Sequence, residues 1–211
     1  MNSSLINKIA VWVTSVILTY GGLTGCGSLE LKDNTAELSG VKVTLENAEI
    51  TEKNADYDAF LEALTAAFQA VAKKLAADGE GATKLLIGRV SGAKDSQSAK
   101  TIAKSVICSS LVKAAMFGAD ANCGRILCAV GYSGAEVDVK KIDVAYQSAA
   151  GEILVCQNGC GLAFDEAKAE KILLENEITI LITLGDGDGT AEAYGCDLTY
   201  DYVKINGDYR T

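Results

Sequence analysis

The stretch Asp78-Gly-Glu-Gly-Ala-Thr-Lys84 joins an amphipathic segment to an apolar one. Before it, apolar residues recur every three or four positions, which predicts a helix over residues 56–77. After it, residues 84–91 are rich in branched apolar side chains and predict a strand. Gly79 and Gly81 allow positive φ angles and a tight turn around Glu80. The stretch therefore presents the Glu80 carboxylate just before the start of the predicted strand.

The rest of the chain interleaves helical and strand patterns without a strict βαβ rhythm. We expect one or two short strands between residues 29 and 50. Periodicity predicts further helices over residues 96–109, from residue 126 onward, and over residues 165–175. Further strands are predicted over residues 111–117, 137–145, 152–156, 177–184 and 190–200. This order indicates an α+β fold with mixed sheets.

The last residues, 195–211, are too polar for a buried strand and unusually rich in tyrosine and paired charge. Chain ends are poorly ordered unless something ties them down. We therefore expect this tail to be anchored, which would place Asn206 and the terminal residue Thr211 in a defined position. On the residues alone, Asn206-Gly207 is typical of a turn, and Glu80 is typical of a solvated turn residue.

Composition excludes several classes of function. The 211 residues carry 19 Lys and Arg against 28 Asp and Glu, a net charge of -9, which argues against nucleic acid as a partner. The sequence contains no histidine, so a Ser-His-Asp triad, a Cys-His pair and histidine metal ligands are impossible within it.

Seven cysteines are present, and we interpret them as reduced, mostly buried thiols. A zinc site built from Cys123 and Cys128 with Cys156 and Cys160 is the alternative, but these spacings lack the usual C-x-x-C knuckle. We therefore expect no metal and no cofactor. The segment Gly185-Asp-Gly-Asp-Gly189 fits neither a calcium loop nor a phosphate loop, and we interpret it as a hairpin turn.

Three ordered motifs carry a family resemblance: the Glu80 loop, the segment Phe117-Gly-Ala-Asp-Ala-Asn-Cys-Gly-Arg-Ile126, and the tail. Together they resemble ornithine acetyltransferase, the glutamate N-acetyltransferase of arginine biosynthesis, from about Glu49 to Thr211. The resemblance implies part of a mixed-sheet αββα sandwich and a smaller carboxyl-terminal α+β domain. It also implies that Glu80, Asn206 and Thr211 bind substrate. We interpret Arg125, which lies near Asp120, as a structural residue.

The same resemblance implies an acyltransferase that moves acetyl from N-acetylornithine to glutamate, with acetyl-CoA as a further donor in the bifunctional members of the family. Members of that family use a threonine nucleophile, released as a new amino terminus by self-cleavage, whose α-amine can act as the base. We find no convincing counterpart of that threonine in this sequence and assign no catalytic residue. The expected partners are the two small-molecule substrates and the amino-terminal α-chain of the same enzyme, in a hetero-oligomer. The isolated chain is expected to be inactive.

Residues 1–50 form a separate, unassigned leader in this interpretation, and residues 51–211 form the enzyme-like portion. A single cation, an apolar run and the sequence Leu23-Thr-Gly-Cys26 resemble a lipoprotein signal. The alternative function is therefore a non-catalytic, lipid-anchored binding module attached to a membrane through Cys26. The family resemblance favours a cytoplasmic enzyme, with residues 1–50 as a core segment or an upstream artefact.

Overall fold

The computed structural model describes residues 30–32, 35–38, 41–44 and 53–208. The chain divides into two compact units, Met1–Val71 and Ala72–Thr211, and helix α2 (Ala55–Ala77) runs across this boundary. No helix among the described residues is both long and apolar enough to cross a membrane.

The first unit contains a small antiparallel sheet of three strands in the order β1-β2-β3. Its strands are β1 (Glu30–Lys32), β2 (Thr35–Leu38) and β3 (Val41–Thr44). The sequence predicted one or two strands in this region. Helix α2 follows, and its start is capped by Asn54, whose side-chain oxygen accepts a hydrogen bond from the Tyr57 amide at 3.1 Å. The predicted helix is thus confirmed.

The second unit is built around a six-stranded mixed sheet in the order β7-β6-β5-β8-β4-β9. Only β4 and β8 run parallel, and the other neighbours are antiparallel. The strands are β4 (Leu85–Ala93), β5 (Asp143–Ser148), β6 (Gly151–Gln157), β7 (Cys160–Gly161), β8 (Glu177–Thr183) and β9 (Gly189–Cys196). This confirms the α+β class and the mixed sheet.

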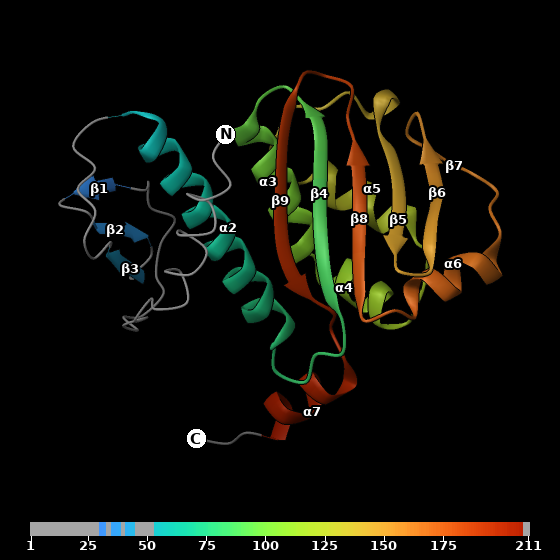
Figure 1. Ribbon diagram of the computed structural model, residues 1–211. Coiled ribbons are helices and arrows are strands. Elements are labelled where there is room, and N and C mark those ends of the chain that lie inside the picture. Colours follow the sequence, from blue (N-terminus) through green and yellow to red (C-terminus); the bar gives the residue numbers. More distant parts are fainter. Residues whose placement is uncertain (1–29, 33–34, 39–40, 45–52, 209–211) are drawn as a thin grey trace. The chain divides into compact units, whose positions relative to one another are not determined.

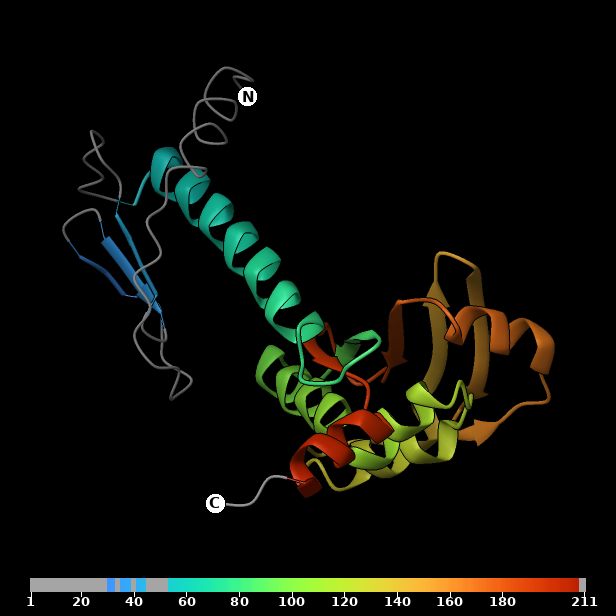
Figure 2. The same ribbon diagram turned by 90° about the horizontal axis from the view of Figure 1, so that it is seen from below.

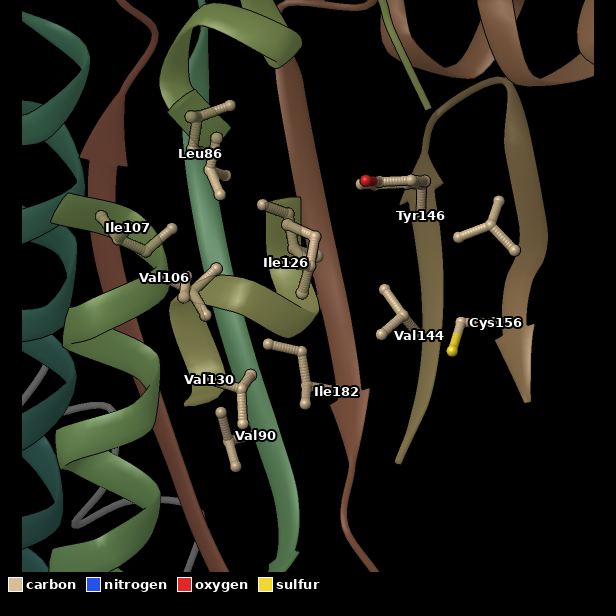
Figure 3. Close-up of a cluster of buried hydrophobic side chains, with 14 of the residues drawn as sticks. Leu86, Val90, Val106, Ile107, Ile126, Val130, Val144, Tyr146, Cys156 and Ile182 are labelled. Atoms are coloured by element: carbon tan, nitrogen blue, oxygen red, sulfur yellow. The ribbon is translucent and has the colours of Figure 1, made fainter. Parts of the chain in front are cut away.

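Helices cover one face of this sheet (Figures 1 and 2). They are α3 (Ser96–Cys108), α4 (Ser110–Phe117) and α5 (Cys123–Gly131), and α6 (Glu166–Leu173) adds its buried side to the same core. Alternate residues of β8, Ile178, Ile180 and Ile182, are at most 1% exposed, as expected for a strand with one buried face. Figure 3 shows part of this core, in which Val144 of β5 lies beside Cys156 of β6 and Tyr146 lies further along β5.

Three local predictions are wrong. Residues 111–117 form helix α4 instead of a strand, because Ser109 caps it and Val112, Ala115 and Met116 recur at helical spacing on its buried side. Residues 139–141 form a short 3-10 helix, so β5 starts only at Asp143. The last strand ends at Cys196, and helix α7 (Tyr200–Asp208) follows it.

The glycine-rich segment 185–189 is not a hairpin turn. It connects β8 to β9, but β4 lies between these two strands in the sheet. The segment therefore crosses the end of β4, where a Cβ on Gly189 would lie 2.3 Å from the backbone of Asp95. The Asp186 carboxylate holds the crossing in place by accepting hydrogen bonds from the Lys141 ammonium at 2.9 Å and the Asp138 amide at 3.2 Å.

A buried ammonium group joins β4 to the ends of two helices. Lys84 is 8% exposed, and its Nζ donates to the carbonyl oxygens of Met116 and Leu173 at 2.7 Å each and of Phe117 at 3.4 Å. These carbonyls lie in the last turns of α4 and α6, and the Met116 oxygen also accepts from the Ala119 amide at 3.3 Å. Burial lowers the pKa of Lys84, and the neighbouring Asp197 opposes that shift. Lys84 thus donates to carbonyl groups at the ends of both helices.

We predict that Lys84→Met lowers the free energy of unfolding by about 3 kcal/mol, because it keeps the apolar stem but removes the ammonium donor from three carbonyl groups at the helix ends. The measurement is urea unfolding at neutral pH. The matched control is Lys104→Met at an exposed position of α3, which we expect to change stability by less than about 0.5 kcal/mol. Equal effects of the two substitutions would contradict the assigned role of Lys84.

Candidate functional site

The candidate site is the loop that follows α2 together with the segment that follows β9. Glu80 lies in the loop, and Asn206 lies in α7. The Asn206 side-chain amide donates a hydrogen bond of 2.7 Å to the Glu80 carboxylate, although the two residues are 126 positions apart in sequence. The structure therefore brings together two of the three residues expected at the site. Thr211 lies outside the described residues.

The end of the loop is fixed by a buried carboxylate. Asp197 is 3% exposed, and its oxygens accept hydrogen bonds from the amides of Thr83 at 2.8 Å and Lys84 at 3.1 Å. The Thr83 hydroxyl donates to the same carboxylate at 2.5 Å. A carboxylate that receives several donors holds them more firmly than a neutral acceptor would. The segment after β9 thus fastens the loop to the start of β4.

The two glycines of the loop have different roles. Gly81 adopts the predicted positive φ of 66°, and a Cβ there would lie 2.9 Å from the Tyr202 amide nitrogen. Gly79 does not adopt a positive φ. A Cβ on Gly79 would instead lie 2.5 Å from the Cys196 sulfur, so its small size permits close approach of the two segments. Both glycines let the polypeptide after β9 pass directly beside Glu80.

The start of α7 is anchored, as predicted for the tail, but its body is exposed. Thr199 is 4% exposed and lies at the N-cap position of α7, where its hydroxyl oxygen accepts from the Tyr202 amide at 3.1 Å. The rings of Tyr200 and Phe117 meet edge to face, with centroids 5.3 Å apart. None of the α7 residues is buried. Asn206 lies inside this helix and not in the turn that its local sequence suggested.

Other candidate residues are placed elsewhere. The Arg125 guanidinium donates to the Leu111 carbonyl oxygen at 2.8 Å, which is a structural contact with a backbone group. Among the residues that the structure describes, no three Cys, Asp or Glu side chains are grouped so as to hold a metal ion. The prediction of mostly buried thiols is wrong for the described residues. Cys156 is buried, Cys123 and Cys196 are partly buried, and Cys108, Cys128 and Cys160 are exposed.

The exposed carboxylate of Glu80, beside a side-chain amide, can bind a cationic group of a small ligand. A carboxylate forms charge-assisted hydrogen bonds with an ammonium group. The carboxamide of Asn206 offers both donors and an acceptor to a neighbouring polar group.

Two residues that hold the site together, Thr199 and Asp197, were not predicted from the sequence. Thr199 is indicated only weakly, by its position ahead of an acidic and aromatic run. The sequence gave no direct signal for the burial of Asp197.

Comparisons with known proteins identify the family of the chain. The ArgJ family model matches residues 33–211. The chain belongs to the ArgJ family. The match starts upstream of Glu49, where the sequence resemblance was expected to begin, and it confirms the resemblance to ornithine acetyltransferase.

Two curated relatives and one solved structure illustrate the likeness. An arginine biosynthesis bifunctional protein ArgJ of Clostridium acetobutylicum is 51% identical over 165 residues, which are 78% of this chain and 40% of the relative. Its counterpart in Caldanaerobacter subterraneus subsp. tengcongensis is 46% identical over 193 residues, which are 92% of this chain and 47% of the relative. The crystal structure of the Bacillus halodurans protein has a TM-score of 0.72 at 36% identity, covering 99% of this chain and 95% of that chain.

The chain spans less than half the length of these two curated relatives. The comparisons give no support to the alternative of a lipid-anchored binding module. Cys26, on which that alternative depends, lies outside the described residues.

Proposed function

We propose that this chain is the substrate-binding, carboxyl-terminal portion of an acetyltransferase of arginine biosynthesis that moves acetyl from N-acetylornithine to glutamate. Family membership supports the reaction, because the curated relatives carry the name of an arginine biosynthesis bifunctional protein. The hydrogen bond between Glu80 and Asn206 is the main support for placing the substrate site at these residues. It joins the two predicted binding residues from distant parts of the sequence.

In this proposal, Glu80 binds an ammonium group of the ornithine moiety, and Asn206 binds a polar group beside it. Thr211, the third residue that the family resemblance names, is proposed to bind the same substrate. The chain supplies no nucleophile. That group comes from an amino-terminal α-chain, and the active assembly is a hetero-oligomer in the cytoplasm. An acidic chain of net charge -9 suits cationic ligands better than nucleic acid.

We predict that the 211-residue chain binds L-ornithine and that Glu80→Gln weakens the affinity about tenfold or more, since a charge-assisted bond is replaced by a neutral one. The measurement is calorimetric titration. The matched control is Glu136→Gln, because the Glu136 side chain is 89% exposed and its contact with the Lys94 ammonium is long, at 3.5 Å. Wild-type affinity in the Glu80 variant would contradict the assigned role of this carboxylate.

We further predict that the chain alone transfers no acetyl group, and that transfer appears when an amino-terminal fragment bearing the family's threonine is added. The fragment can be taken from the Clostridium acetobutylicum relative, which is 51% identical to this chain over the shared region. The measurement is movement of labelled acetyl from N-acetylornithine to glutamate, with the added fragment alone as control. A folded assembly of both fragments without transfer would contradict the proposed reaction.

A further inference from the structure

One buried hydroxyl group contacts both halves of the candidate site. The Thr199 Oγ1 donates a hydrogen bond to the Gly81 carbonyl oxygen at 2.6 Å and accepts one from the Tyr202 amide at 3.1 Å. A hydroxyl has one donor and two acceptor positions, so it can make both contacts at once. Gly81 follows Glu80 directly, and Tyr202 lies one helical turn before Asn206. Thr199 therefore lies between the loop and the helix that carry the site.

These contacts close a ring. The Asn206 amide donates both to the Glu80 carboxylate at 2.7 Å and to the Tyr202 carbonyl oxygen at 2.9 Å. Tyr202 is joined through its amide to Thr199, which is joined to Gly81 and hence to Glu80 along the backbone. The distance between the Glu80 and Asn206 side chains is thus tied to the hydroxyl of a third residue.

We propose that Thr199 is the positioning residue of this site, which fixes the Glu80 loop against α7 and so sets the geometry of Glu80 and Asn206. The role of this geometry in ligand binding rests on the proposed function. The positioning of the loop by Thr199 does not depend on it. Thr199 is 4% exposed, while Glu80 and Asn206 are exposed. An exposed polar contact contributes little by itself, so the buried contact determines how the two exposed side chains meet.

Asp197 cannot replace Thr199 in this role. Its carboxylate binds Thr83 and Lys84, which lie at the far end of the loop and at the start of β4. Asp197 therefore fastens the loop to the sheet, and Thr199 fastens it to α7. The Thr199 contacts therefore supplement the direct Glu80–Asn206 hydrogen bond with a backbone link between the loop and the start of α7.

The first test needs no ligand. It measures hydrogen–deuterium exchange by mass spectrometry in two segments, residues 79–84 and residues 200–208. The Ala82 amide, which donates to the Gly79 carbonyl oxygen at 2.9 Å, reports on the loop beside Gly81, and the amides of Thr83 and Lys84 report on its attachment to Asp197. We expect Thr199→Val to speed exchange about tenfold in both segments, because it removes the shared hydroxyl. Thr199→Ser, which keeps the hydroxyl, is expected to stay within about twofold of wild type.

A second variant separates capping from positioning. Thr199→Asp retains an N-cap acceptor for α7 but has no donor for the Gly81 carbonyl when ionised. We expect fast exchange in residues 79–84 and near wild-type exchange in residues 200–208. The matched control is Thr101→Val, which removes a threonine hydroxyl that donates to the Gln97 carbonyl within α3. Faster exchange in α7 alone for Thr199→Val would show that Thr199 is merely a cap and would overturn the proposal.

The ligand test follows on the same chain. Titration with L-ornithine should give about tenfold weaker affinity for Thr199→Val and near wild-type affinity for Thr199→Ser. Unchanged affinity in a folded Thr199→Val chain would also overturn the proposal. If the wild-type chain itself does not bind L-ornithine, the proposed function fails, and the exchange experiment still decides whether Thr199 positions the loop.

Discussion

Two buried charges at the junction of β4 and β9 hold the second unit together at the end where the site lies. The Asp197 carboxylate accepts hydrogen bonds from the backbone amides of Thr83 and Lys84, and the Lys84 ammonium donates to the final carbonyl groups of α4 and α6. Charges buried in this way stabilise a fold only when their bonds are satisfied, because each has lost its contact with water. Here they join one sheet, two helices and one loop at a single point.

The position of the site follows from this junction. The Glu80 and Asn206 side chains can meet in a defined way only if the loop is held at both ends and the start of α7 is fixed. Residues 196–199 provide both, since Cys196 packs against Gly79, Asp197 binds the loop end, and Thr199 caps α7. Residues 196–199 thus hold the two segments that carry the exposed side chains of Glu80 and Asn206. Binding residues on loops are commonly positioned by a scaffold in this way.

The sequence predicted the strongly periodic elements well, including α2, α3, α6, β4 and β8, because a stripe or a run of branched residues marks each of them. It missed α4, since the run from Leu111 to Phe117 is too short and too apolar for periodicity to separate helix from strand. It also mistook residues 185–189 for a hairpin, because the insertion of β4 between β8 and β9 depends on contacts distant in sequence. Glu80 and Asn206 were named through a family resemblance, whereas nothing local in the sequence indicated their contact.

The central claim is that Glu80 and Asn206 act on the same bound molecule. A double-mutant cycle for L-ornithine affinity, with Glu80→Gln, Asn206→Ala and the combined variant, tests it most directly. The account predicts coupling, so that the combined variant loses much less affinity than the product of the two single losses. Two independent, fully multiplicative losses, or no loss from either change, would contradict it.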